Sequence, residues 1–325
     1  MKSECAVCYV TDINYLLPSL VSATTLRRYV GPNKADIFIF LIDEENDTTV
    51  NLKRYLKHLA IEIHHFYSSA YSDIDIRKYK KSHVPLASVG RFFLDELLPS
   101  RFSKIVYIDG DTWINRDPSA LVDATIPAGR FAAAEDTLYL QQHNSFSRSA
   151  RKIRNYYNAL GVREGNGYFN SGVFAVSRNT WRTLSREAYE FLLKNTELCV
   201  FHDQSAMNAV AGDRRLRLSC AWNFQTPYRY FVTENGIKPI IYHFNKPLKP
   251  WMGPVAPWQD MYLEYRTLAD KEELATLPLK MADTNAIEKH NLRSRRKSLL
   301  SKSPILAGMA RIYMGHNKLE NMSWL

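Results

Sequence analysis

Short apolar runs alternate with helix-like patterns over the first 110 residues of this 325-residue chain. Each run is long enough for a buried strand, and a helical pattern separates it from the next run. Repeated β–α units favour a mainly parallel sheet, with ligands bound at the carboxyl ends of its strands. The chain is therefore predicted to have an α/β fold with a mixed, mainly parallel sheet. Strands are predicted at residues 5–11, 36–42, 61–66 and 105–108, and helices at 15–29, 47–59 and 84–97.

The alternation continues, less regularly, through the second half of the chain. Residues 67–83 and 165–172 are predicted to be loops, and Asp203 is predicted to cap a helix that ends at residue 211. The pattern is lost between 278 and 289, which predicts one domain over 1–280 and an appended helical tail over 281–325. The other strands are predicted at 130–135, 173–176 and 239–243, and the other helices at 147–160 and 179–194.

The run Asp109-Gly110-Asp111 directly follows the apolar residues 105–108. Two carboxylates this close repel each other when buried, and a divalent cation removes that conflict. We therefore predict a metal site that holds a phosphate-bearing donor, the alternative being an ordinary Asp-Gly turn. The chain has no GxxxxGK[ST] run and no GxGxxG after its first strand. A diphosphate is thus expected to be held by metal rather than by a glycine-rich loop.

The four cysteines are predicted to be buried free thiols rather than zinc ligands. Cys5 and Cys8 fall inside an apolar segment, and Cys199 and Cys220 are far apart in the sequence. Such thiols are consistent with a reducing cytoplasm. No stretch reaches 18 uncharged apolar residues and no signal peptide is evident, so a cytoplasmic protein without a spanning helix is expected.

Positive charge is concentrated near the end of the chain. Between residues 288 and 320 there are eight Lys or Arg and two Glu, which is six of the ten net positive charges. Apolar residues follow at roughly helical spacing from Leu299, with Pro304 as a break. This tail is predicted to bind the anionic inner face of the cytoplasmic membrane, the alternative being a solvated basic tail. No nucleic-acid-binding motif occurs, so a nucleic-acid partner is not expected despite a pI of about 9.3.

Six short motifs occur in a defined order along the chain. Together they resemble glycosyltransferase family 8, the retaining sugar-nucleotide transferases, and in particular the bacterial lipooligosaccharide galactosyl- and glucosyltransferases. The resemblance covers about residues 5–260. The motifs are Thr11-Asp12-Ile13-Asn14-Tyr15, Ser88-Val89-Gly90-Arg91-Phe92, Tyr107-Ile108-Asp109-Gly110-Asp111, Tyr168-Phe169-Asn170-Ser171-Gly172-Val173, His202-Asp203-Gln204-Ser205, and the run from His243 to Trp251 that contains Lys246 and Lys249.

This resemblance implies a GT-A type domain that transfers galactose or glucose from a UDP-hexose donor. The implied acceptor is a glycan or a lipid-linked saccharide, such as a lipooligosaccharide core. The implied cofactor is Mn²⁺, with Mg²⁺ as a substitute. By resemblance, Asp109, Asp111 and His243 are the metal ligands. The donor-binding residues implied are Thr11, Asp12, Asn14, Arg91, Asp109, Gly110, Asp111, Asn170, Asp203, Gln204, Lys246 and Lys249, and Asp136 lies beside the sugar and the acceptor.

The catalytic residues are expected among Gln204, Asp203 and Asp136. Gln204 occupies the position that a nucleophile would need, but an amide is a poor nucleophile, so a front-face reaction is expected with Gln204 orienting the sugar. The chain departs from the family pattern at Lys246, where the family usually has Gly. A Lys there limits backbone approach to phosphate if a positive φ is required, although its ammonium could add a contact. The alternative function is a UDP-sugar or carbohydrate-binding protein that keeps the fold with weak or no catalysis.

Overall fold

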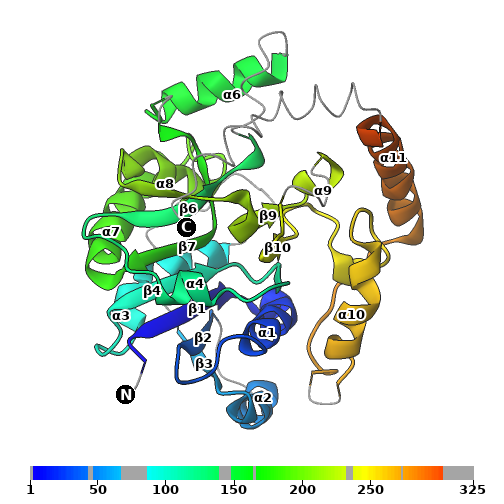
Figure 1. Cartoon of the computed structure of the whole chain (residues 1–325), viewed down its shortest axis with the longest axis horizontal. Coiled ribbons are helices and arrows are strands. Elements are labelled where there is room, and N and C mark those ends of the chain that lie inside the picture. The colour runs from blue at the N-terminus through cyan, green and yellow to red at the C-terminus, as the bar shows by residue number, and fades with distance from the viewer. Residues whose placement is uncertain are drawn as a thin grey trace.

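The computed structural model describes residues 3–42, 47–66, 86–138, 148–163, 166–231, 237–271 and 274–302. Its centre is a seven-stranded sheet of order β3-β2-β1-β4-β7-β6-β8 (Figure 1). Strands β3, β2, β1 and β4 are parallel neighbours, and β7 is antiparallel to both β4 and β6. The strands are β1 Cys5–Thr11, β2 Asp36–Leu41, β3 Ile61–His65, β4 Lys104–Ile108, β6 Phe131–Glu135, β7 Phe169–Ser177 and β8 Arg215–Leu218. The predicted mixed, mainly parallel sheet is confirmed.

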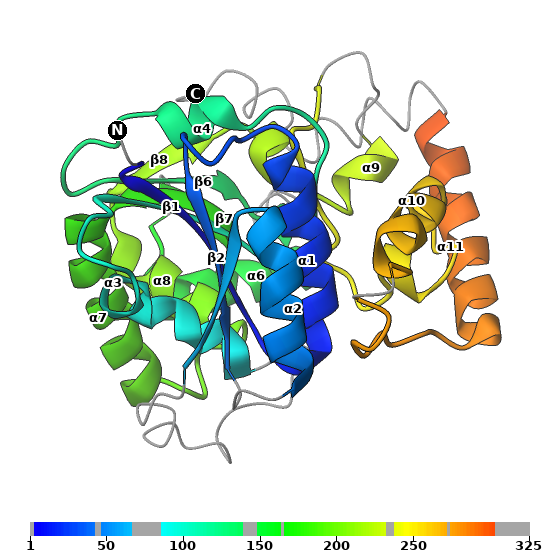
Figure 2. The same cartoon turned by 90° about the horizontal axis from the view of Figure 1, so that it is seen from below.

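Helices cover both faces of this sheet (Figure 2). Helices α1 and α2 lie on one face, and α3, α7 and α8 lie on the other. Alternate residues of β1 enter the two cores, Val7 and Tyr9 on one side and Ala6 and Cys8 on the other. The helices are α1 Ile13–Arg27, α2 Asp47–His58, α3 Leu94–Leu97, α4 Ser119–Asp123, α6 Arg148–Ala159, α7 Arg178–Lys194, α8 His202–Ala211, α9 Tyr228–Phe231, α10 Gln259–Ala269 and α11 Thr284–Lys302.

A second, three-stranded sheet of order β5-β10-β9 lies beside the first and carries part of the functional site. Its strands are β5 Thr112–Ile114, β9 Phe224–Gln225 and β10 Ile241–His243. Only β10 was expected from the sequence, as part of the predicted strand 239–243; β5 and β9 are too short, at three and two residues, to show a periodicity. All four cysteines are buried free thiols, as predicted. Within the described ranges, no helix combines the length and apolar composition needed to cross a bilayer.

The predicted helix at 84–97 is confirmed over its described residues, where a 3-10 helix, Leu86–Phe93, is followed directly by the short α3; residues 84 and 85 lie outside the described part of the chain. Two other local predictions were wrong. The predicted loop at 165–172 overlaps β7, which begins at Phe169, because the polar and small residues that follow extend a strand whose later residues pair with both β4 and β6. Asp203 does not cap α8; it lies in the first turn, and its carboxylate bonds side chains from other elements. The predicted loop at 67–83 lies outside the described residues.

The tail helix α11 begins at Thr284, inside the predicted helical tail 281–325 and fifteen residues before Leu299. One of its faces contacts the segment before α10: Asn291 bonds the backbone of Ala256 and Pro254, and His290 bonds Ala256 O. A Cβ on Gly253 would lie 2.4 Å from Ile287 Cδ1, so glycine allows this close approach. The helix therefore packs directly on the body of the protein. The predicted division at residue 280 remains a prediction.

Candidate metal and sugar-nucleotide site

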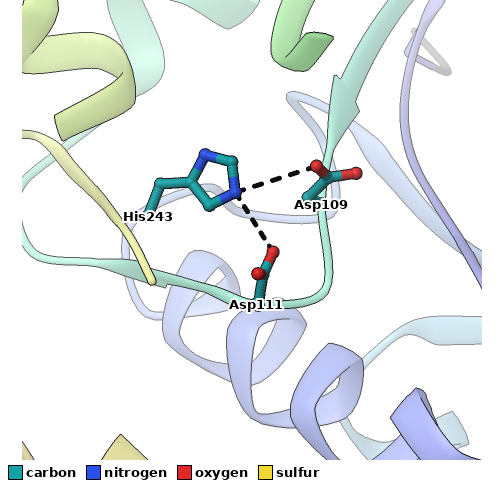
Figure 3. A group of neighbouring side chains, drawn as sticks. All are labelled: Asp109, Asp111 and His243. Atoms are coloured by element: carbon teal, nitrogen blue, oxygen red, sulfur yellow. Dashed lines mark ion pairs between the residues drawn. The ribbon is translucent and has the colours of Figure 1, made fainter. Parts of the chain in front are cut away.

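Asp109, Asp111 and His243 converge at the junction of the two sheets. Asp109 follows β4, Asp111 precedes β5, and His243 ends β10, which pairs antiparallel with β5 so that His243 lies opposite Thr112. His243 Nε2 is 3.2 Å from Asp111 Oδ1 and 3.8 Å from Asp109 Oδ2 (Figure 3). One ligand atom from each residue lies within 4.8 Å of the others. Two carboxylates and an imidazole form a donor set that suits a divalent cation such as Mn²⁺.

Two glycines make this convergence possible. A Cβ on Gly110 would lie 2.1 Å from Ser19 Oγ of α1, so the turn between the two aspartates passes too close to α1 for a side chain. A Cβ on Gly172 of β7 would lie 2.5 Å from His243 Cε1 and 2.6 Å from Asp109 Oδ2. Both glycines thus allow a close approach at the site, although the sequence indicated Gly110 only as a donor-binding residue and Gly172 only as part of a motif.

Lys249 provides positive charge at the same place. Its Nζ lies 2.6 Å from Asp111 Oδ2 and donates to Phe244 O at 2.5 Å. Burial raises the pKa of Asp111, but Lys249 and His243 outweigh it and hold that pKa well below its usual value. Burial lowers the pKa of Lys249, but Asp111 reverses this and raises it above its usual value. Both groups are therefore charged near neutral pH, and the ammonium is placed to contact an anion bound beside Asp111.

Arg91 lies behind Asp109 and is 4% exposed. It donates to Asp109 Oδ1 at 3.0 Å and to the carbonyl and hydroxyl oxygens of Ser171, and its guanidinium lies 4.3 Å from the centre of the Tyr107 ring. These contacts fix the orientation of Asp109, because Tyr107 OH also donates to Asp109 Oδ1 at 2.8 Å. Contact of Arg91 with a donor remains a prediction.

Arg91 also contacts Asp203, whose carboxylate is buried against Ser88 and Arg91. Ser88 Oγ donates to its Oδ1 at 2.7 Å, and Arg91 Nε is 3.3 Å from its Oδ2. The 3-10 helix explains this pairing, because residues three apart project from the same side of such a helix. Burial raises the pKa of Asp203 above its usual value, although Arg91 and Ser88 oppose the rise. With 2% exposure, Asp203 supports Arg91 and β7 rather than facing an open site.

Three sequence-predicted residues meet on the other side of β7. Asp136, which follows β6, accepts hydrogen bonds at Oδ2 from Asn170 Nδ2 at 2.8 Å and from Gln204 Nε2 at 3.2 Å. The other end of the Gln204 amide accepts from Ser171 N at 3.2 Å. Both ends of Gln204 are thus held by protein groups, and the side chain is half-buried. This arrangement suits a residue that orients a bound molecule.

Three of the predicted donor-binding residues, Thr11, Asp12 and Asn14, lie where β1 enters α1. Thr11 is buried at the end of β1, and Asp12 caps α1 by accepting from the backbone amides of Asn14 and Tyr15. Asn14 is exposed in the first turn. Lys246 is half-buried in the segment between His243 and Lys249, and its amide donates to Phe244 O. Among the described residues other than glycine, only Ala60 and His202 have a positive φ, so Lys246 is accommodated without that strain.

One site residue had no signal in the sequence. Asn223, in the 3-10 turn Cys220–Asn223 before β9, is fully buried between His243 and Asn170. Its Oδ1 lies 2.8 Å from His243 Nδ1, and its Nδ2 donates to Asn170 Oδ1 at 2.9 Å. No spacing or motif could have indicated it, because its position follows from how the second sheet packs on the first.

Comparison with known proteins agrees with this geometry. The family model for glycosyl transferase family 8 matches residues 6–253. General stress protein A of Bacillus subtilis (strain 168) is 26% identical over 215 residues, which are 59% of this chain and 70% of that protein. Probable galacturonosyltransferase-like 4 of Arabidopsis thaliana is 24% identical over 53% of this chain, which spans only 49% of that protein. A crystal structure of the galactosyltransferase LgtC with donor and acceptor sugar analogues aligns with a TM-score of 0.66 at 17% identity, covering 82% of this chain and 95% of LgtC. The expected GT-A fold is thereby confirmed.

Proposed function

The chain belongs to glycosyltransferase family 8, and from this premise we propose that it moves a hexose, galactose or glucose, from a UDP-sugar to a glycan acceptor with retention of configuration. The observation that carries the proposal is the grouping of Asp109, Asp111 and His243 beside Lys249, with Asp136 and Gln204 across β7. The cation ligands and Lys249 suit a diphosphate, and Asp136 and Gln204 suit a sugar. The acceptor we propose is a saccharide of the lipopolysaccharide or lipooligosaccharide core type.

The side chains divide the chemistry between them. Asp109, Asp111 and His243 would hold Mn²⁺, or Mg²⁺ in its place. When bound, this cation supplies Lewis-acid stabilisation of the leaving diphosphate. Lys249 adds a fixed positive charge beside Asp111, which stabilises the negative charge that builds on the departing phosphate.

Retention requires either a covalent intermediate or attack from the leaving-group side. Asp203 is enclosed by Ser88 and Arg91, and Gln204 is an amide held at both ends. Neither suits a nucleophile. We infer a front-face reaction in which the leaving phosphate oxygen accepts the proton of the acceptor hydroxyl, and Gln204 and Asp136 orient the sugar. A covalent sugar trapped on Asp203 or Gln204 would contradict this mechanism.

The test is a panel of UDP-sugars assayed for UDP release with Mn²⁺, with Mg²⁺ and with excess EDTA. We expect one hexose donor to be turned over, the rate to fall to background in EDTA, and added Mn²⁺ to restore it. Binding of UDP with Mn²⁺ but no turnover with any donor or acceptor would favour the alternative, a sugar-nucleotide-binding protein without catalysis. Lys246 is the residue that favours this alternative, but its backbone lacks the positive φ that would demand glycine.

We also propose that α11 attaches the enzyme to the inner face of the cytoplasmic membrane. Leu292 and Leu299 are 56% and 66% exposed on the side of α11 away from the body, beside the exposed Arg293 and Arg296. Apolar and basic side chains on one helix face suit an anionic lipid surface. A lipid-linked acceptor would then be presented beside the site. The rest of the proposed tail, 303–325, lies outside the described residues.

Removing this outer face should weaken binding to anionic lipid vesicles by about 30-fold or more, since each basic residue contributes roughly 1 kcal/mol near such a surface. The change is Leu292→Ser and Leu299→Ser with Arg293→Gln and Arg296→Gln, measured by vesicle co-sedimentation. Point changes are preferable to deletion because His290 and Asn291 support the segment 254–256. Arg151→Gln with Lys152→Gln on exposed positions of α6 is the matched control. Equal vesicle binding by all three proteins would exclude a membrane role for this face.

A further inference from the structure

A continuous chain of buried hydrogen bonds crosses the site from His243 to Gln204. His243 Nδ1 contacts Asn223 Oδ1, Asn223 donates to Asn170, and Asn170 donates to Asp136, which also accepts from Gln204. Asn223 is fully buried, and Asn170, Asp136 and His243 are each no more than 6% exposed. Hydrogen bonds in such surroundings are strong, and an unmade bond is costly. The cation ligand His243 and the residues Asp136 and Gln204 are therefore linked by one chain of buried side-chain hydrogen bonds.

The directions of the bonds between Asp136 and His243 are set by one backbone amide. Gly172 N donates to Asn170 Oδ1 at 3.0 Å, so the Asn170 oxygen is an acceptor and its NH₂ group faces Asp136. Asn223 must then direct its own NH₂ group to Asn170 Oδ1 and its oxygen to His243. A carbonyl oxygen only accepts, so the hydrogen of this last bond is on His243 Nδ1. Nε2, the other ring nitrogen, is the atom that faces Asp109 and Asp111.

We propose that Asn223 is a positioning residue that couples the metal ligand His243 to the sugar-side residues Asn170 and Asp136. The inference rests on the proposed function, because that function assigns a cation and a sugar to the two sides. Toward the cation, Asn223 fixes the tautomer and ring orientation that direct Nε2 at the two carboxylates, as outer partners of metal-bound histidines do. Toward the sugar, it supplies a hydrogen bond that holds Asn170 against Asp136.

Asn223→Asp and Asn223→Leu separate these two roles. An Asp keeps an oxygen for His243 Nδ1–H but places a second oxygen against Asn170 Oδ1, where two acceptors repel each other. We expect Asn223→Asp to keep Mn²⁺ affinity at least at the wild-type level and to reduce the preference for UDP-sugar over UDP about tenfold. Asn223→Leu removes both bonds, and we expect it to weaken Mn²⁺ binding by about 10–100-fold as well. Asn223→Ser, which is too short to reach both partners, replaces the Leu variant if that protein does not fold.

Mn²⁺ affinity is measured by electron paramagnetic resonance of the free ion without donor, and UDP and UDP-sugar affinities by calorimetry with Mn²⁺ present. Asn195→Asp at the end of α7, a partly buried amide whose Nδ2 donates to the backbone carbonyl of Phe191, is the control and should match wild type in every measurement. Wild-type Mn²⁺ affinity in the Leu or Ser variant would overturn the assignment. So would an Asp variant that loses Mn²⁺ affinity and the preference for UDP-sugar over UDP to the same extent. Failure of the wild type itself to bind any UDP-sugar would instead count against the proposed function, and the Mn²⁺ titration would still test the effect of Asn223 on the metal ligands.

Discussion

Replacing Asp111 with Asn is expected to lower Mn²⁺-dependent UDP release by at least about 10³-fold, because the change removes both a cation ligand and the counter-charge of Lys249. Raising the Mn²⁺ concentration should not restore the rate of UDP release. The variant should also be less stable, because Lys249 is 7% exposed and its ammonium loses its paired carboxylate. Breaking a buried ion pair by removing one partner typically costs about 3–5 kcal/mol.

Lys249→Met is the informative comparison for Asp111→Asn. It removes the cation but leaves Asp109, Asp111 and His243 in place, so Mn²⁺ should still raise its melting temperature, whereas Asp111→Asn should show no such rise. The double variant Asp111→Asn/Lys249→Met removes both charges and should recover part of the lost stability without recovering activity. An Asp111→Asn protein that still gains thermal stability from Mn²⁺ would show that the cation binds elsewhere.

The pattern of the sequence was sufficient for the parallel strands β1, β2 and β4 but not for the start of β7. Strands β1, β2 and β4 are continuous apolar runs, and such runs are typical of strands buried on both faces. Strand β7 begins with Phe169-Asn170-Ser171-Gly172, whose polar and small residues resemble a turn. These residues lie in a buried strand because Arg91, Asp203 and Asp136 satisfy their polar groups. Local propensity therefore failed at the site itself, where tertiary contacts determine the structure.

The candidate site shows a similar division. Asp109, Asp111 and His243 were grouped through resemblance to a family, and the structure brings them together across 134 residues of sequence. The structure places Arg91 and Asp203 behind the ligands, where they hold Asp109 and β7. A motif identifies residue types and their order, but it does not distinguish a side chain that contacts a ligand from one that orients its neighbour. Asn223 lies outside every motif for the same reason, since its effect depends on the ring orientation of His243.

Gly172→Ala is expected to have the second largest effect, and it acts through geometry alone. The new methyl carbon would lie 2.5 Å from His243 Cε1, 2.6 Å from Asp109 Oδ2 and 2.9 Å from Asn170 Oδ1. None of these side chains can move freely. Asn223 holds His243, Arg91 and Tyr107 hold Asp109, and Asp136 holds Asn170. β7 itself cannot shift easily, because it is paired with both β4 and β6. The strain should therefore spread the cation ligands apart.

We expect Gly172→Ala to reduce Mn²⁺ affinity about 100-fold and to destabilise the fold by about 1–3 kcal/mol, the usual range for overpacking a buried position. Unlike Asp111→Asn, this variant keeps all three cation ligands, so a high Mn²⁺ concentration should restore part of its UDP release. Gly31→Ala is the matched control, because its new Cβ would meet only the exposed side chain of Asn33, which can move away. Wild-type Mn²⁺ affinity in a folded Gly172→Ala protein would mean that His243 and Asp109 are free to separate. In that case the hydrogen-bonded supports from Asn223, Arg91 and Tyr107 would not be what fixes the geometry of the cation site.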